Sequence, residues 1–392
     1  MRSIFFQILS LAFILMLSSS ALAATLGPAE TIDDLRAMID EADANDTLLI
    51  SGEIIMDEDV PLSTRFPVRI TSDAGETCSL KNLRLENASI TFTNVLLDDS
   101  LSITGTSNIC LSKGVHILGR ESKNALSFIG NGALIIEPNC QITASPESNG
   151  IFISHTGGEF YASIEGSVYG GSGQNGGTGV IISPLLDSSA ILISGSIEGG
   201  NGIALGGHAL DLYNLSGNAF ITIDGSLTGG SGFIGGDAIQ LISATDSVSV
   251  GIGGRIKGGS GQSHGGCALI LMNTTGSSSF NLTGSLSGGD AIGASAQPGT
   301  SLQLVGNNAV VRTRIDNCIL EDGRYLNSTP KPDATIRPLP TTTASPVPTP
   351  TAKIIAKVTP MPEITSPADH VAYIIPPESP TKPGRYHTKE SK

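Results

Sequence analysis

The chain has 392 residues and a formal net charge of −14 at pH 7, and it contains no tryptophan. This acidic balance argues against a nucleic-acid partner and suits a soluble extracellular surface. The five cysteines are odd in number and irregularly spaced, so they do not form a disulfide framework, and we expect small buried thiols. They are Cys78, Cys110, Cys140, Cys267 and Cys318.

Residues 1–23 have the pattern of a secretory signal peptide. Arg2 precedes an apolar run from Ile4 to Leu17, and Ala21-Leu-Ala23 stands before the expected cleavage site. The alternative is an uncleaved membrane anchor, but the apolar run is short for a bilayer. No later segment is apolar enough over sufficient length to span a membrane. We therefore expect a secreted protein, either free or associated with the cell surface.

Residues 24–46 are expected to form an N-terminal cap that contains a short helix. Thr31-Ile-Asp-Asp34 has the spacing of a capping box, in which the first and last side chains each bond the other's backbone amide. The apolar residues that follow recur on one side of a helix. A cap is needed because the last strand of a stacked sheet otherwise presents unpaired backbone groups. The apolar residues are Leu35, Met38, Ile39 and Ala42.

A five-fold repeat dominates the chain between residues 166 and 289. Its glycine segments begin at residues 166, 195, 225, 254 and 284, which gives spacings of 29, 30, 29 and 30 residues. A second Gly-Gly pair follows four of them, at residues 176, 206, 235 and 265, and a short apolar strand comes after each pair. A repeat of this length is typical of a stacked, solenoid architecture.

Within each repeat the apolar residues alternate with polar ones, which is the two-residue period of a β-strand. Equivalent positions stay in phase, so each apolar column should stack on itself inside the solenoid. Three strands in about 30 residues suit one turn of a right-handed parallel β-helix, which we expect over residues 47–326. One column is Ile164, Ile193, Ile223, Ile252 and Leu282; another is Val168, Ile197, Leu227, Ile256 and Leu286; a third is Leu210, Ile239 and Leu269.

Two parts of the chain resemble known β-helix proteins. The run from Asp34 through Asn45-Asp-Thr-Leu-Leu-Ile-Ser51 resembles the entrance to pectate-lyase-like β-helix proteins. The Gly-Gly-x-Ala-Ile/Leu units, such as Gly236-Asp-Ala-Ile239, resemble the passenger β-helices of bacterial surface proteins. Together these resemblances imply the parallel β-helix architecture over residues 30–320. They say little about chemistry.

The composition changes near residue 327, because 14 of the 21 prolines lie in residues 327–392. With the run Thr341-Thr-Thr-Ala-Ser-Pro346, this segment is expected to be a disordered tail rich in proline and threonine. A linker or wall-penetrating role is the favoured interpretation. The basic residues near its end could contact anionic polymers.

The outward residues carry no convincing catalytic cluster. A pectate lyase needs several carboxylates for Ca²⁺ and a basic residue, but Arg255 and Lys257 are the only Lys or Arg between residues 124 and 311. Arg255-Ile-Lys257 matches a tripeptide of the polygalacturonase family, whose partner motifs are missing. The N-terminal turns contain more charged residues, so a catalytic site there remains an alternative. The charged residues are Arg84, Asp98, Asp99 and Arg120.

One column after the second Gly-Gly pair carries residues of metal-ligating type. It contains His208, Asp237 and Cys267 on adjacent turns, about 4.8 Å apart. Metal binding and nucleophilic catalysis are alternatives, but the favoured interpretation is a turn position that tolerates small or polar residues. We therefore predict no metal site and no cofactor. Thr178 precedes these residues in the column, and Asp290 is expected to follow them.

The glycine loops lack the regular aspartates of calcium-binding repeats, and we expect their glycines to supply turns with positive φ. Regular polar ladders on the outside favour a non-catalytic role in binding, adhesion or structure, with a polysaccharide as ligand. The alternative is a carbohydrate-active lyase or hydrolase that uses the N-terminal turns.

Overall fold

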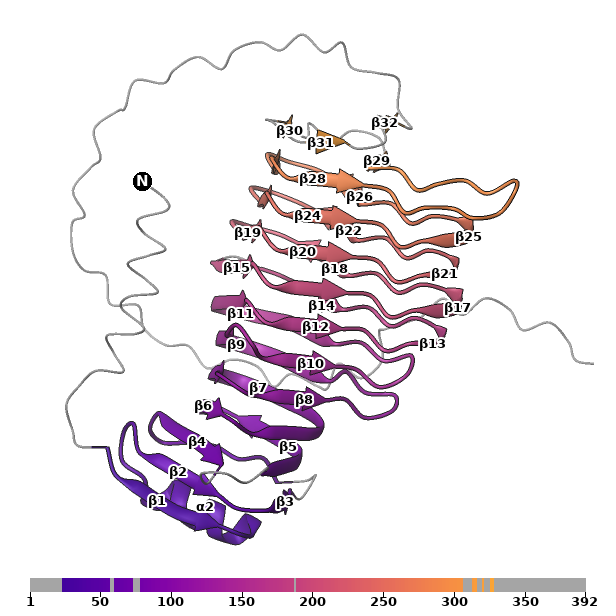
Figure 1. Ribbon diagram of the computed structural model, residues 1–392. Coiled ribbons are helices and arrows are strands. Elements are labelled where there is room, and N and C mark those ends of the chain that lie inside the picture. Colours follow the sequence, from indigo (N-terminus) through magenta and orange to yellow (C-terminus); the bar gives the residue numbers. More distant parts are fainter. Residues whose placement is uncertain are drawn as a thin grey trace, which may run out of the picture. The chain divides into compact units, whose positions relative to one another are not determined.

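The computed structural model describes residues 23–56, 60–72, 78–186 and 188–305, and the backbone of three strands within 312–327. The expected signal peptide (apart from Ala23), Cys318 and the expected tail beyond Asn327 lie outside the described residues. Among the residues that are described, no helix has the length and apolarity needed to cross a membrane. The protein is an all-β parallel solenoid with one short helix near its N-terminal end (Figure 1).

The N-terminal cap combines β1 (Thr25–Ala29) with α2 (Ile32–Glu41). The predicted capping box is confirmed: the Thr31 hydroxyl accepts the Asp34 amide at 3.2 Å, and the Asp34 carboxylate accepts the Thr31 amide at 3.1 Å. Leu35 and Ile39 are buried against the first turn. The sequence does not predict β1. This strand pairs in parallel with β2 and so covers the N-terminal edge of the solenoid with backbone hydrogen-bonding groups.

Each turn of the solenoid contributes a strand to each of three faces, and consecutive turns pair in parallel. The first face contains β2 (Thr47–Ile50), β4 (Val68–Ser72), β6 (Ser89–Thr93), the C-terminal parts of β7 (Leu96–Leu111), β9 (Leu126–Ile136) and β11 (Ile151–Ile164), then β15 (Ser189–Ile193), β19 (Phe220–Ile223), β23 (Ser249–Ile252), β27 (Ser279–Leu282) and β30 (Arg312–Ile315).

The second face contains β3 (Glu53–Ile55), the N-terminal parts of β5 (Ser79–Glu86) and β7, then β8 (His116–Leu118), β10 (Gln141–Thr143), β12 (Ser167–Tyr169), β16 (Ser196–Glu198), β20 (Ser226–Thr228), β24 (Arg255–Lys257), β28 (Ser285–Ser287) and β31 (Ile319–Leu320). The third face contains the remaining parts of β5, β7, β9 and β11, then β14 (Val180–Ile182), β18 (Leu210–Leu215), β22 (Ile239–Ala244), β26 (Leu269–Thr274), β29 (Leu302–Val305) and β32 (Tyr325–Asn327).

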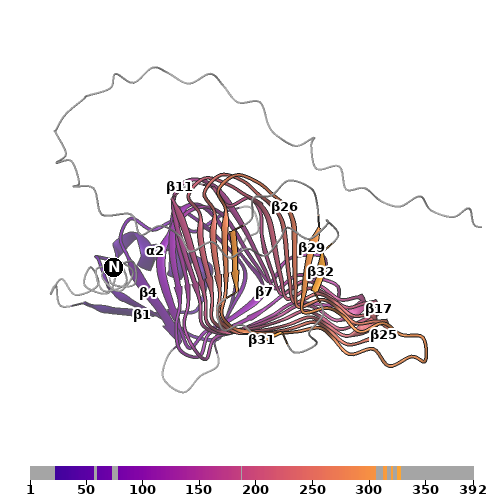
Figure 2. The ribbon, with the colours of Figure 1, turned by 90° about the horizontal axis from the view of Figure 1, so that it is seen from above.

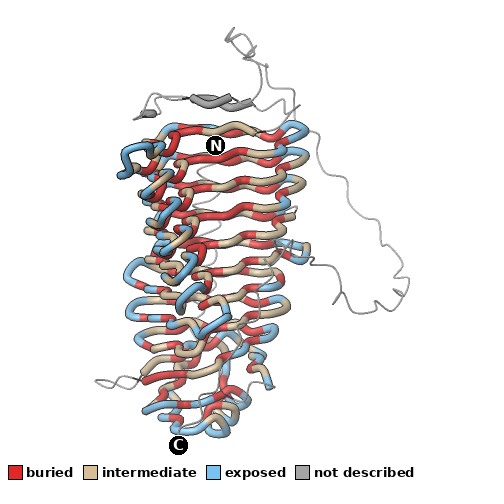
Figure 3. Tube along the Cα trace, turned by 90° about the vertical axis from the view of Figure 1, so that its right-hand side faces the viewer, coloured by how far each residue is buried: buried red, intermediate tan, exposed pale blue. Residues whose placement is uncertain are grey.

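The predicted apolar columns are confirmed by the strand register. Ile164 pairs with Ile193, and Val168 pairs with Ile197, in one uninterrupted stack each. These side chains are buried and alternate with partly exposed ones along every turn, which Figure 3 shows as repeating red and tan bands. The core is therefore a continuous apolar cylinder, because no single turn can bury its own apolar face.

Sharp bends at the ends of the third face are made by residues with positive φ. Asn214, Ser243 and Asn273 occupy equivalent places at this turn and have φ values of 53°, 68° and 48°. Asn tolerates this left-handed conformation better than most residues, because its short polar side chain can bond the local backbone. These three residues therefore form a column of turn residues.

The glycine loops project from the solenoid as a separate four-stranded parallel sheet, which we call the glycine fin. Its strands are β13 (Gly173–Asn175), β17 (Gly202–Leu205), β21 (Gly232–Ile234) and β25 (Gly261–His264). Figure 2 shows the fin extending from one corner of the solenoid. The fin comprises residues 170–177, 199–207, 229–236, 258–266 and 288–299.

The expected reason for the fin's glycines is wrong. None of them has the positive φ that we predicted. They are required because the two strands of each loop and the next loop approach too closely for a side chain: a Cβ on Gly206 would lie 1.9 Å from the Gly230 carbonyl oxygen. This approach lets the glycine amides bond one another along the fin, for example Gly207 N to Gly200 O at 2.8 Å and Gly230 N to Gly207 O at 2.8 Å.

Candidate functional site

The connection between the second and third faces lengthens along the chain, and this change creates a pocket. In β5 the connection is one residue, Asn82, and in β7 it is the pair Asp99–Ser100. In the next two turns it lengthens to residues 119–125 and 144–150, and the fin begins in the turn after that. The long connections project past the short ones. A pocket of about 520 Å³, within the usual range for ligand sites, lies at this step.

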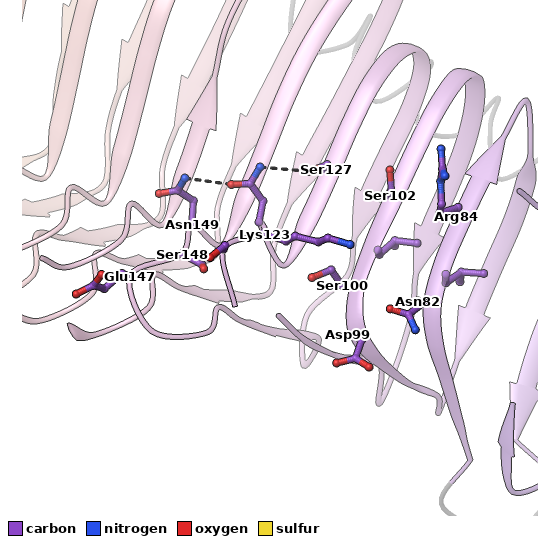
Figure 4. A pocket seen from close by; sticks show the side chains of 14 residues that line it. Asn82, Arg84, Asp99, Ser100, Ser102, Lys123, Ser127, Glu147, Ser148 and Asn149 are labelled. Atoms are coloured by element: carbon purple, nitrogen blue, oxygen red, sulfur yellow. Dashed lines mark hydrogen bonds between the residues drawn. The ribbon is translucent and has the colours of Figure 1, made fainter. Parts of the chain in front are cut away.

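The polar pocket, as we call it, is lined almost entirely by hydrogen-bonding and charged side chains (Figure 4). Its members are Asn82, Leu83, Arg84, Asp99, Ser100, Leu101, Ser102, Ser122, Lys123, Asn124, Ser127, Glu147, Ser148 and Asn149. No aromatic ring is among them, so a ligand would be held by hydrogen bonds and charge and not by stacking. The outward positions of β5, β7 and β9 form the floor, because Arg84, Ser102 and Ser127 are register partners.

Asparagine side chains form a fixed ladder along one wall. The Asn149 amide donates to Asn124 Oδ1 at 3.0 Å, and the Asn124 amide donates to Ser127 Oγ at 3.2 Å. Asn149 Oδ1 in turn accepts the Thr178 backbone amide at 2.9 Å. Because each amide has its partner, these groups are held in place before any ligand arrives, and such preorganisation lowers the entropic cost of binding.

Three cationic side chains lie in or beside the pocket. Arg84 and Lys123 line it and are exposed, with Lys123 drawn between the asparagine wall and the Arg84 end in Figure 4. Arg120 stands at the rim, where its guanidinium donates to Asn82 Oδ1 at 3.3 Å and its backbone amide donates to Ser100 Oγ at 3.0 Å. Of the charged residues singled out in the N-terminal turns, Arg84 and Asp99 therefore meet in one site, with Arg120 beside it.

The fourth of those residues, Asp98, does not belong to the pocket lining. Its carboxylate lies 3.6 Å from the Lys81 ammonium, which also pairs with Glu53 at 2.9 Å. The acidic residues that do line the pocket are Asp99 and Glu147, and the Glu147 carboxylate accepts the Gln174 backbone amide of β13 at 2.7 Å. Within the described residues, no three His, Cys, Asp or Glu side chains are grouped closely enough to hold a metal ion.

The predicted column of His208, Asp237 and Cys267 is a backbone-capping ladder. His208 Nδ1 accepts the Asp237 amide at 3.0 Å, and Asp237 Oδ1 accepts the Cys267 amide at 2.6 Å. Because Nδ1 accepts this hydrogen bond, it has no proton of its own to donate. The Asp237 carboxylate, which lies 3.6 Å from Nδ1, therefore accepts no hydrogen bond from this nitrogen. The three side chains thus bond successive turns instead of converging on one point.

The column continues differently from the prediction at its C-terminal end. Thr300, and not Asp290, follows Cys267, and its hydroxyl donates to the Cys267 sulfur at 3.2 Å. The reason is that a glycine loop is present in this last repeat as well, where Gly261 pairs with Ala291 and His264 with Gln297. Asp290 lies in that loop, 3.6 Å from the Lys257 ammonium.

The four thiols that the structure describes are suited to packing and not to nucleophilic attack. Cys78 and Cys140 are buried and Cys110 and Cys267 are half-buried, and all four are free. Burial raises the pKa of Cys110 to about 12 and that of Cys140 to about 11. Burial also raises the pKa of Cys267, so its thiolate is disfavoured, and the thiolate is the reactive form.

Asp211 is the most deeply buried carboxyl of the third face. It is 3% exposed, accepts the Thr178 hydroxyl at 3.1 Å, and leaves Oδ1 without a hydrogen-bond partner in the described structure. Burial raises its pKa, an effect that the nearby His208 partly offsets. Because it is buried and does not line the polar pocket, Asp211 is not part of the site.

No protein-family model matches the chain, and no curated protein matches its sequence. Among solved structures, the chain is similar to the catalytic domain of a GH87 α-1,3-glucanase in complex with nigerose. The TM-score is 0.25 and the identity 10%, over 76% of this chain and 68% of that one. A likeness of this size identifies neither a ligand nor an activity. The resemblance to pectate-lyase-like proteins stays a prediction beyond the shared parallel β-solenoid.

Proposed function

We propose that this protein is secreted and binds a polysaccharide, without cleaving it, in the polar pocket. One observation carries the proposal: amide, hydroxyl and charged groups converge in a preorganised pocket of about 520 Å³ on an otherwise regular rod. Sugar hydroxyls are both donors and acceptors, and they match the asparagine and serine groups of the wall. A polymer fits better than a free sugar, because the lining residues come from four successive turns of the solenoid.

Arg84 and Lys123 give the pocket its strongest hydrogen-bond donors. Donors with a full charge form hydrogen bonds about twice as strong as neutral ones, and with no aromatic platform available they should supply much of the affinity. Replacing both residues by alanine should weaken binding of the preferred glycan at least about tenfold, or ~1.4 kcal/mol. The measurement is a glycan-panel screen with the full chain, followed by calorimetric titration of the best ligand.

Arg255→Ala provides the matched control, because Arg255 is an exposed arginine on β24, far along the rod from the pocket. It should leave the affinity unchanged. Equal loss in both variants would show that general charge, and not the pocket, holds the ligand. Absence of binding to every glycan in the panel would overturn the proposal.

Catalysis is the second candidate, because two carboxylates, Asp99 and Glu147, line one pocket beside Lys123. Paired carboxylates are the usual machinery of glycoside hydrolysis, and a basic residue can abstract a proton in a lyase. The same panel is therefore assayed for reducing ends and for unsaturated products. Product release that Asp99→Asn or Glu147→Gln abolishes would replace the binding role by an enzymatic one.

A further inference from the structure

The glycine fin carries large apolar side chains that solvent surrounds. Ile203 is 73% exposed, Phe233 52%, Leu205 48% and Ile234 39%. They lie on the two central strands of the fin, β17 and β21, where Leu205 and Ile234 are register partners. Adjacent exposed apolar groups of this size usually mark a surface that another molecule covers.

The outer strands of the fin end in polar groups instead. Gln174 and Asn175 of β13 and Gln262 and His264 of β25 are all exposed. Reading across the four strands, the row of register partners is Asn175, Leu205, Ile234, His264. This row runs polar, apolar, apolar, polar, so it reads the same in both directions. On the next loop it is followed by another polar residue, Gln297, which pairs with His264.

A palindromic surface is complementary to itself under a two-fold rotation. An axis that passes between β17 and β21 places Leu205 against the partner's Ile234, and Asn175 against the partner's His264. In a two-fold dimer the same patch is used by both subunits, and this symmetry is the commonest among soluble homo-oligomers.

The charge distribution favours a second copy of this chain over other occupants. The chain carries a net charge of −14, yet within the fin Asp290 is the only Lys, Arg, Asp or Glu residue. Two copies would repel each other through most of their surfaces, whereas fin-to-fin contact brings almost no like charges together. Without any Lys or Arg, the fin is also poorly suited to an anionic membrane.

We infer that the fin is a homodimerisation surface, at which two chains meet antiparallel through the apolar side chains of β17 and β21. Only the narrow edge of the fin takes part. The buried area therefore falls at the low end for protein interfaces, so the dimer exchanges with monomer instead of being permanent. This inference is independent of the polar pocket, which lies on the turns before the fin.

Sedimentation equilibrium of the full chain over ~1–500 μM tests the inference. The average mass should rise from that of one chain towards twice that value, and the double variant Ile203→Ser/Phe233→Ser should raise the dimer dissociation constant about tenfold or more. Ile55→Ser is the matched control, since Ile55 is 58% exposed on β3 and should leave association unchanged. A constant mass for the wild type, or equal effects of the two replacements, would overturn the inference.

Cross-linking tests the orientation of the two chains. A Leu205→Cys chain mixed with an Ile234→Cys chain should form a disulfide-linked dimer under mild oxidation more readily than either variant alone, because these positions face each other across the axis. The wild type, whose described thiols are buried or half-buried, is the blank. Stronger linkage within each single variant would indicate a parallel pairing and contradict the antiparallel dimer.

Discussion

At the residue scale, the glycines of the fin act through the absence of a side chain. Gly206→Ala would place a Cβ 1.9 Å from a backbone oxygen of the next loop, so the stack must open. Overpacking of this kind costs roughly 1–3 kcal/mol. Gly251→Ala is the matched control, since its Cβ would find only the Ile221 carbonyl oxygen at 4.0 Å. Thermal unfolding followed by circular dichroism should show a lower Tm for the first variant and an unchanged one for the second.

The same glycines show what the sequence could and could not predict. Their spacing fixes the repeat, and the alternation around Ile164 and Val168 fixes which residues face the core. Glycine, however, is used both for positive φ and for close approach, and spacing does not distinguish the two. The sequence did not predict the polar pocket and indicated only that the N-terminal turns are rich in charge. Lys123 and Glu147 join Arg84 and Asp99 through connections of unequal length, which no repeat encodes.

At the scale of elements, the capping box links α2 to pH. The hydrogen bond that the Thr31 hydroxyl donates to the Asp34 carboxylate is the main reason why the pKa of Asp34 lies below its ordinary value of 3.8. A carboxyl whose pKa is lower in the folded state stabilises the fold above its unfolded pKa, and this contribution disappears as the pH falls through the folded pKa. Thr31→Ala should therefore lower the Tm at pH 7, by an amount equivalent to about 1 kcal/mol for a lost N-cap, and by less once the pH has fallen through the lowered pKa of Asp34. An equal loss at both pH values would show that the carboxylate contributes nothing.

At the scale of the whole solenoid, each turn is a unit that can be removed. Deleting residues 196–225 joins Gly195 to Ser226. Ser226 then takes the place of Ser196, because Ser196 and Ser226 are register partners. Stability in such stacks is a sum over turns and their interfaces, so the shortened chain should fold with a lower Tm. The deletion removes β17 with Ile203 and Leu205, and thus half of the exposed apolar side chains on the central strands of the fin, but it leaves every residue of the polar pocket. We therefore expect unchanged glycan affinity together with loss of the dimer, measured on one sample by calorimetry and sedimentation. If glycan affinity falls with the dimer, pocket and fin are coupled, and the two sites do not act separately.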